Sequence, residues 1–317
     1  MTSPSRVGRY PPTRSAAYGT RRSPAEGGYG VSAGRSGPTA TQLFLGARLR
    51  RMREAAGCSV AAAAVALRIS PVAMRRLESG HLPPEEAQIA PLLTAYGQAE
   101  SIDELLDEVA RARRPGWWEG YREVLPDWLA DYLALEEHAQ IIRLYAPATV
   151  PELLQSPRYA EALLRIQHPD DDARLINRRL ELLIGRQAVL RRTTPRPPSV
   201  WALVEEATLR RQVGGPAVMR EQFEHLRELA EELRFTIRVM PMHTAHSALL
   251  CGPVQMVRYQ AADLADRVLL RTLDGAEVSD RPDVVRQYLM ALDSAASVRD
   301  SLPITEWIAN WEEKAVA

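Results

Sequence analysis

Two short apolar segments stand next to each other in residues 59–80. The first, Val60–Ala66, consists only of alanine and valine, and the second has its apolar positions at Ile69, Met74 and Leu77. The spacing of Met74 and Leu77 places both on one side of a helix. The pattern therefore predicts two short helices joined by a tight turn, with these three residues facing a small core.

The residues around the two segments fit the starts of helices. Ser59 and Ser70 precede the first and second segments, where a serine hydroxyl can accept a hydrogen bond from a free backbone N–H. Pro71 follows at the first helical position, where its missing N–H costs nothing. Ala64 is predicted at the crossing of the helices, where a small side chain permits close approach.

The polar side of the second helix has the composition of a DNA-contacting surface. If Met74 and Leu77 point inward, Val72, Ala73, Arg75 and Arg76 point outward. They lie near the positive N-terminal end of a helix that can enter a DNA major groove. An ordinary helical hairpin without DNA contact is the alternative.

This stretch resembles the helix-turn-helix of Cro/lambda-repressor-type regulators, the XRE family. The resemblance rests on Ala64, Ile69, Ser70, Met74, Leu77 and the closing Glu78-Ser79-Gly80. It implies DNA contacts from Ser59, Ser70, Pro71, Val72, Ala73, Arg75 and Arg76. Two positions depart from the family pattern: Val60 replaces a glutamine that touches phosphate, and Arg68 replaces the turn glycine. Arg68 must therefore accept an unusual backbone angle or a reshaped turn.

Three further helices are predicted around the motif. Phe44–Ala56 carries Leu45, Leu49 and Met52 on one face, at spacings that build a helical core contact. Glu85–Tyr96 and a helix capped by Ser101 follow the motif. The five helices define an all-α DNA-binding domain at residues 42–112, in which Arg51 can contact phosphate or remain on a solvated face.

An aromatic junction and a longer second domain follow. Residues 113–135 hold Trp117, Trp118 and Trp128, which can pack a domain junction or line an aromatic ligand pocket. Residues 136–317 are predicted to form an α+β effector or partner-binding domain. Its strands are expected at Ile141–Tyr145, Ser199–Val204, Phe235–Val239, Val254–Tyr259 and Arg267–Leu270, and its helices at Pro157–Ile166, Asp172–Leu190, Pro216–Leu233, Pro282–Ser297 and Ile304–Glu313.

The order of motifs in this second part resembles one group of actinobacterial XRE regulators, which have a long C-terminal domain without established chemistry; WhiJ-like developmental regulators are of this type. The matching motifs are Arg113–Trp118, Leu125–Trp128, Ile142–Tyr145, Val150–Gln155, Gly214–Pro216, Val239–Pro241, His246, Gly252–Pro253 and Asp280–Pro282. The resemblance implies that a small acidic protein is a possible partner.

Charge separates the front of the chain from the rest. The net charge is zero, but residues 1–40 carry +5 and residues 41–80 another +5. A basic front with an acidic remainder favours contact with a polyanion. Met1–Thr41 is rich in arginine, serine, proline and glycine, and we expect a disordered tail there. Two cysteines in unrelated contexts and the lack of a long apolar run favour a cytoplasmic, nucleoid-associated protein that is neither disulfide-linked nor membrane-bound.

Motifs for catalysis or for cofactors are missing. His243-x-x-His246 lacks the glutamate of a zinc-protease helix, so we expect no metal. His246 can instead line a small-molecule pocket or be structural. Glu205-Glu206 offers two carboxylates without a nucleophile, so a charged helix start is the simpler interpretation. No phosphate-binding loop and no nucleophile elbow occur, and we expect no cofactor and no catalytic residue.

The sequence thus predicts a non-enzymatic transcriptional regulator that binds double-stranded DNA, acts as a homodimer, and is controlled by a ligand or a small partner protein through its C-terminal domain. The candidate pocket residues are Trp117, Trp118, Trp128 and His246. The alternative is a partner-binding module, antitoxin-like or a scaffold, with weakened DNA binding; Val60 and Arg68 are the residues that favour it. An enzyme in the C-terminal domain has no motif behind it.

Overall fold

The computed structural model describes residues 40–112, 116–193, 196–233, 235–259, 264–272 and 275–316. The predicted disordered tail falls outside these residues, except for Ala40 and Thr41. Both are helical, because the first helix starts at Ala40, four residues before its predicted start.

Residues 40–112 form an entirely helical region with its own core. Its helices are α1 (Ala40–Ala55), α2 (Val60–Leu67), α3 (Pro71–Glu78), α4 (Glu86–Ala95) and α5 (Ile102–Ala112). Leu49, Met74 and Leu77 are completely buried, and Ala64 is 1% exposed. Ile69 packs against this core from a half-buried position. The inward positions predicted for α1 and for the two-helix motif are confirmed. The predicted cap at Ser101 is wrong, because Ser101 is the last residue of a 3-10 helix, Ala99–Ser101, that runs directly into α5.

Small residues let α1 pass close to the end of α3. A Cβ atom on Gly46 of α1 would lie 2.7 Å from the backbone oxygen of Glu78, and one on Gly80 would lie 2.9 Å from the backbone of Gln42. Gly80 also has a φ of +77°, which favours glycine. Any side chain at either position would push α1 away from α3.

The C-terminal region is built on a mixed sheet, which has seven strands within the described ranges. They are β1 (Ile141–Ala146), β2 (Ser199–Glu205), β3 (Thr236–Met240), β4 (Val254–Arg258), β5 (Arg267–Arg271), β6 (Ala276–Ser279) and β7 (Leu302–Pro303). The order across the sheet is β6-β5-β4-β1-β2-β3-β7. Strands β1, β2 and β3 are parallel, and every other neighbouring pair is antiparallel.

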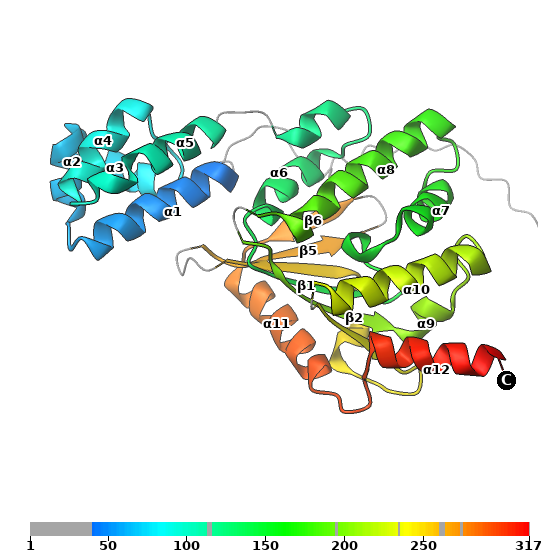
Figure 1. Cartoon of the computed structure of the whole chain (residues 1–317). Coiled ribbons are helices and arrows are strands. Elements are labelled where there is room, and N and C mark those ends of the chain that lie inside the picture. Colours follow the sequence, from blue (N-terminus) through cyan, green and yellow to red (C-terminus); the bar gives the residue numbers. More distant parts are fainter. Residues whose placement is uncertain are drawn as a thin grey trace, which may run out of the picture. The chain divides into compact units, whose positions relative to one another are not determined.

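Helices cover both faces of this sheet. They are α6 (Asp127–Glu136), α7 (Pro157–Gln167), α8 (Ala173–Gln187), α9 (Glu206–Arg210), α10 (Pro216–Glu231), α11 (Pro282–Ala296) and α12 (Ile304–Val316). Helices α7, α8 and α10 lie on one side of the sheet and α11 on the other (Figure 1). The sheet is therefore the middle layer of three.

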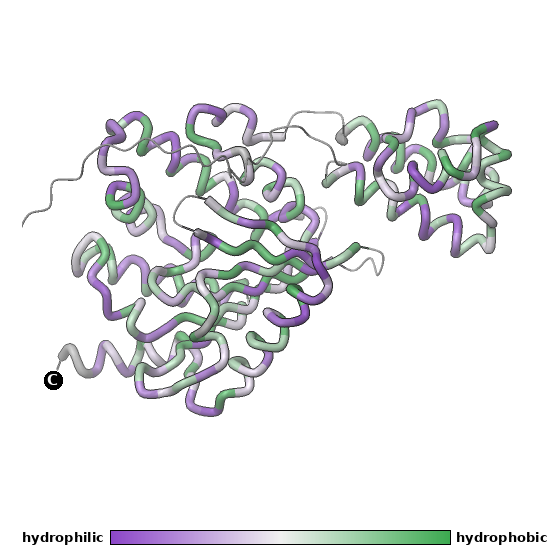
Figure 2. Tube along the Cα trace, turned by 180° about the vertical axis from the view of Figure 1, so that it is seen from behind, coloured by the Kyte–Doolittle hydropathy of each residue, from purple (hydrophilic) through white to green (hydrophobic). Residues whose placement is uncertain are grey.

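Each face of the sheet has a separate hydrophobic core. Ile142 and Leu144 of β1 belong to the larger core under α6, α7, α8, α10 and α12. Tyr145 of β1 and Leu203 of β2 are register partners and belong to the smaller core under α11. The alternation follows from the period-two side-chain pattern of strands. Figure 2 shows how hydrophobic residues recur along the central strands.

The strands and long helices predicted for the C-terminal region are present, with ends that shift by a few residues. Among the described α-helices and strands, α6, α9, β6 and the two-residue β7 were not predicted. In the aromatic junction, Trp118 and Tyr132 are buried in the larger core, as the packing interpretation of this segment predicted. None of the helices within the described ranges combines the length and apolar character that a bilayer crossing requires.

Candidate functional site

The turn between α2 and α3 adopts the unusual backbone angle that the sequence required. Arg68 caps the end of α2 with φ 55° and ψ 39°, and its neighbour Ile69 donates a backbone hydrogen bond to the carbonyl of Ala64 at 3.0 Å. Within the described ranges, no other non-glycine residue has a positive φ. The turn thus keeps its shape without glycine, at a steric cost of about 1 kcal/mol for an L-residue in this region.

Both serine caps predicted for the two-helix motif are formed. The hydroxyl of Ser59 accepts a hydrogen bond from the backbone N–H of Ala62, and that of Ser70 accepts one from Ala73, each at 3.1 Å. Pro71 occupies the first turn of α3. These bonds fix where α3 starts, and therefore which of its side chains face away from the core.

The outward side of α3 exposes one apolar side chain and two cations. Val72 is 63% exposed, although it is a large hydrophobic residue. Arg75 and Arg76 are exposed, whereas Ala73 is half-buried. Among the described residues, neither arginine has an ion-pair or hydrogen-bond partner for its guanidinium group. We call Val72, Arg75 and Arg76 the exposed face of α3.

The acidic groups near α3 are occupied by other arginines. Glu78 is 7% exposed and receives two hydrogen bonds from Arg53, Nε to Oε1 at 2.6 Å and Nη2 to Oε2 at 3.1 Å. The hydrogen bond to Glu78 raises the pKa of Arg53 above its usual range. Arg50 pairs with Glu54 at 3.0 Å. These carboxylates are thus engaged away from the exposed face of α3, and Arg51 of α1 is exposed as well.

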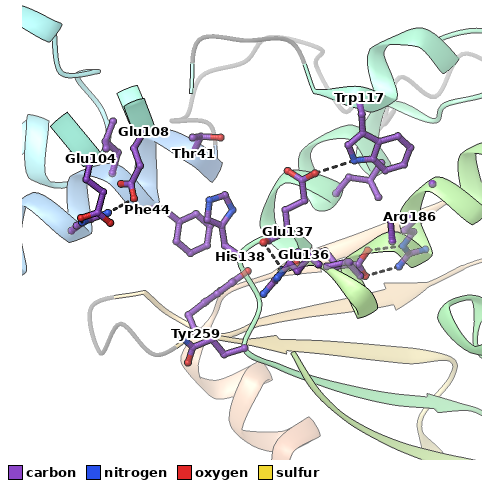
Figure 3. Close-up of a pocket in the computed structure, with 18 of the residues that line it drawn as sticks. Thr41, Phe44, Glu104, Glu108, Trp117, Glu136, Glu137, His138, Arg186 and Tyr259 are labelled. Atoms are coloured by element: carbon purple, nitrogen blue, oxygen red, sulfur yellow. Dashed lines mark hydrogen bonds and ion pairs between the residues drawn. The ribbon is translucent and has the colours of Figure 1, made fainter. Parts of the chain in front are cut away.

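A buried charged network lies on the face of the sheet that carries the larger core. Arg186 of α8 donates Nε to Glu136 Oε2 at 2.7 Å and Nη2 to Glu136 Oε1 at 3.0 Å (Figure 3). Glu136 is 1% exposed and Arg186 is 4% exposed. Arg186 also donates to Gln255 Oε1 at 3.0 Å and to a carboxylate oxygen of Glu152.

The network ends at a second arginine. Arg271 of β5 donates Nη1 to Glu152 Oε1 at 2.8 Å, and its guanidinium lies 5.2 Å from the ring centre of Trp128. Burial alone would raise the pKa of Glu152, but the charges of Arg271 and Arg186 more than offset it and hold that pKa below its usual range. Glu152 is therefore ionised near neutral pH.

The tryptophans predicted as pocket residues occupy three different environments. Trp118 is 7% exposed in the larger core. Trp117 is 37% exposed, and its indole N–H donates to Glu137 Oε1 at 2.9 Å, as Figure 3 shows. Trp128 is half-buried beside Arg271. Trp117 and Trp118 do meet edge to face, with ring centres 5.7 Å apart.

His246 lies on the opposite face of the sheet, in a polar cluster of its own. Its Nε2 is 2.8 Å from Glu205 Oε1, and the hydroxyl of Tyr145 donates to the same oxygen at 2.9 Å. The side chain of His246 is completely buried, and its Nδ1 has no hydrogen-bond partner among the described residues. The structure thus joins His246 to Glu205, which the sequence had raised separately, and separates it from the tryptophans.

Glu206 confirms the simpler interpretation of the glutamate pair, because it begins helix α9 and its Oε2 accepts the backbone N–H of Met242 at 3.1 Å. Within the described ranges, no group of three or more histidine, cysteine, aspartate or glutamate residues is placed to hold a metal ion.

The sequence did not lead to the buried network or to the Arg53–Glu78 pair. One signal was present: Arg186 follows the apolar run Leu182–Ile184 and precedes another, Ala188–Leu190, and a lone charge in such a run is expected to be paired when buried. Its partners lie 34 to 69 residues away, so no local spacing could identify them.

Comparisons with known proteins add two family matches. A helix-turn-helix domain model matches residues 45–108, which include α2, the Arg68 turn and α3. A domain of unknown function, DUF5753, matches residues 129–305, more than half of the chain. No curated protein and no solved structure matches the chain. The chain carries a helix-turn-helix domain and belongs to the family defined by the domain of unknown function DUF5753.

Proposed function

We propose that this protein is a sequence-specific transcriptional regulator of the XRE type, which binds double-stranded DNA through α3. The observation that carries the proposal is the exposed face of α3. The outer side of this helix exposes a valine and two arginines, and these side chains can contact bases in a major groove. There, arginine recognises guanine and an apolar group contacts the thymine methyl.

The residues of the exposed face have different roles. Arg76 and Val72 lie one turn apart and contact base edges, while Arg75, nearer the side of the helix, contacts phosphate. We assign contacts with the DNA backbone to Ser59, Ser70, Pro71, Ala73 and Arg51. The buried Arg53–Glu78 pair supports the interface without touching DNA, since both side chains are enclosed.

The proposed division of labour follows the two regions. Residues 42–112 bind DNA, and residues 113–135 connect this region to the C-terminal region. Residues 136–317 bind a ligand or a small acidic partner protein that alters DNA binding. The protein acts as a homodimer in the bacterial cytoplasm, on the nucleoid, since two copies of a short recognition helix are needed to specify a full operator. The C-terminal region has no enzymatic role in this proposal.

Selection from a random duplex pool tests the DNA-binding function and needs no known operator. The full-length protein is used to enrich duplexes over several rounds, and the enriched pool is sequenced. The proposal expects a defined motif that the protein binds more tightly than a scrambled duplex of the same composition. Enrichment of no motif, with equal binding to all duplexes, would overturn the function.

One feature supports a second candidate, a partner-binding protein with weakened DNA binding. Val60 stands where XRE regulators carry a phosphate-contacting glutamine, and it is half-buried against the helical core. The Val60→Gln variant separates the two candidates. If the protein is a DNA-binding regulator, the wild type already selects a motif and the variant only strengthens binding. If DNA binding is weakened, only the variant enriches a motif.

A further inference from the structure

A cavity of about 380 Å³ lies between helices α7 and α8 and the face of the sheet that carries the larger core. It differs from the pocket suggested by the sequence, because none of the four predicted pocket residues lines it. Most of its wall is apolar: Leu144 and Leu269 come from strands, Leu163 and Leu164 from α7, and Leu183 from α8. Its size is within the range of about 300–1,000 Å³ that is typical of small-molecule sites.

The polar side chains of the lining include the ion-paired Glu152 and Arg271, which we call the polar end of the cavity. Both side chains are about one third exposed, at 32% and 34%. Only Nη1 of Arg271 has a partner among the described residues, so Nε and Nη2 retain N–H groups that a ligand can use. Each oxygen of Glu152 accepts one arginine hydrogen bond, and a carboxylate oxygen has room for a second. The polar end can therefore donate and accept.

The charges at this end are balanced within the protein. Two glutamates, Glu136 and Glu152, face two arginines, Arg186 and Arg271, in one connected network. A charged ligand would add an unpaired charge to an apolar, partly desolvated cavity, which is costly. We propose that this cavity binds an uncharged, mainly apolar small molecule whose polar end, a hydroxyl, amide or similar group, bonds with Arg271 and Glu152.

The network also supplies a route by which an occupant can act on the chain. Arg186 bonds both Glu152 at the cavity and Glu136 at the end of α6, and α6 makes up the C-terminal part of the junction. A ligand that draws Arg271 or Glu152 toward itself changes the bonds left for Arg186, and with them the hold on α6. That the occupant is the effector of DNA binding rests on the proposed function; that the cavity binds it does not.

A matched pair of fluorescent probes tests the site and its charge preference. N-phenylnaphthylamine is apolar, uncharged and has one N–H donor, and anilinonaphthalene sulfonate has the same ring skeleton with a negative charge. Titration of the full-length protein should show saturable, one-to-one binding of the uncharged probe and at least about tenfold weaker binding of the anionic one. Equal affinity for both probes at this site would overturn the proposed ligand class.

Two pairs of variants locate the probe. Leu183→Trp fills the cavity, and Ile184→Trp, at the next position of α8, is its control because Ile184 is 38% exposed and outside the lining. Gln167→Trp blocks the exposed rim, with Ile166→Trp as its control on α7. Each blocking variant should weaken probe binding by about tenfold or more, and the controls should not. Thermal unfolding verifies that all four variants fold. If Leu183→Trp does not fold, the rim variant Gln167→Trp alone shows whether the probe binds in the cavity.

Probe binding that none of the blocking variants reduces would show that the cavity is not the site. The effector role is tested separately, by titrating the selected duplex with and without the uncharged probe. A change in DNA affinity of about threefold or more that Gln167→Trp abolishes supports it. An unchanged affinity with the probe bound overturns the effector role but leaves the binding site and the DNA-binding function intact. Failure to select any DNA motif would instead count against the proposed function alone.

Discussion

The exposed face of α3 and the buried network of the sheet region use arginine in opposite ways. On the exposed face of α3, Arg75 and Arg76 stand in solvent without partners among the described residues. In the sheet region, Arg186 is almost fully buried and bonded to two glutamates and a glutamine. The same side chain thus leaves its charge available at one place and has it neutralised at the other.

The difference teaches what each region is arranged to do. A free arginine in water is already solvated, so it can exchange that water for a phosphate or a guanine at little cost. A buried arginine is hard to move, because removing either partner leaves an uncompensated charge in the interior. The first arrangement suits recognition, and the second holds helices α6 and α8 to the sheet in one fixed geometry.

The largest expected effect comes from breaking the buried network. Arg186→Met should lower the free energy of unfolding by about 3–5 kcal/mol, because Glu136 is left buried without its cation. Urea unfolding followed by tryptophan fluorescence measures this loss. Arg158→Met is the control: Arg158 is exposed and pairs with Glu221 at 3.4 Å, so its loss should stay within about 1 kcal/mol. Similar losses in both variants would contradict the comparison.

Salt should affect the exposed arginines far more than the buried ones. With roughly 3–5 phosphates neutralised by each protomer, the logarithm of the DNA association constant should fall with the logarithm of salt at a slope of about −3 to −5. Fluorescence anisotropy with a labelled duplex gives this slope. The free energy of unfolding, measured over the same salt range, should change much less, since buried pairs are poorly screened. A flat binding response would exclude direct phosphate contact.

A smaller effect should separate the two arginines of α3. Arg76→Ala should remove about 1–3 kcal/mol of preference for the selected motif, because it deletes a guanine contact. Arg75→Ala should weaken binding to motif and scrambled duplexes alike. Both variants should fold normally, as circular dichroism would show, because neither guanidinium group has a partner in the described part of the chain. A well-folded Arg76→Ala that keeps its full preference would show that another side chain reads the bases.

The smallest effect concerns acid stability. The pKa of Glu152 is lower in the folded protein than in the unfolded chain. Its contribution to stability is therefore complete above the unfolded pKa, and is lost as the pH falls through the folded one. Urea unfolding between about pH 5 and pH 3 should show a shallower loss in Glu152→Gln than in the wild type. An equal slope in both would mean that other carboxylates carry the acid sensitivity.

The sequence predicted those parts of the fold that depend on neighbouring residues. It did not predict contacts between residues that are far apart in the chain. Ser59, Ser70 and Pro71 fixed the starts of α2 and α3, because caps depend on neighbours three residues away. The apolar runs located five of the seven described strands, but not that β1 has parallel β2 on one side and antiparallel β4 on the other. Strand β7 is only two residues long, and no pattern predicts so short a strand.

The same limit applied to the candidate sites. The outward face of α3 followed from helical periodicity alone. Tyr145 and Glu205, in contrast, come together through the pairing of β1 with β2, and His246 reaches them from the loop after β3. The cavity has no local sequence signal, because its polar end joins Glu152 to Arg271 and its leucines, spread over helices and strands, look like any other core residues. The large aromatic side chains of the junction allowed either a ligand pocket or packing, and the burial of Trp118 in the larger core fits packing.

The place of β1 in the sheet also affects how the protein folds during synthesis. Strand β1 leaves the ribosome before the other strands, yet Ile141 pairs with Ser199 on one side and with Arg258 on the other. Both edges of this apolar strand stay open until those later segments appear, and such contacts between distant residues form slowly. The α2–α3 motif needs only its near neighbours. A nascent chain therefore acquires its DNA-contacting helices early and carries an unpaired, aggregation-prone strand for longer, so misfolding should begin in the sheet.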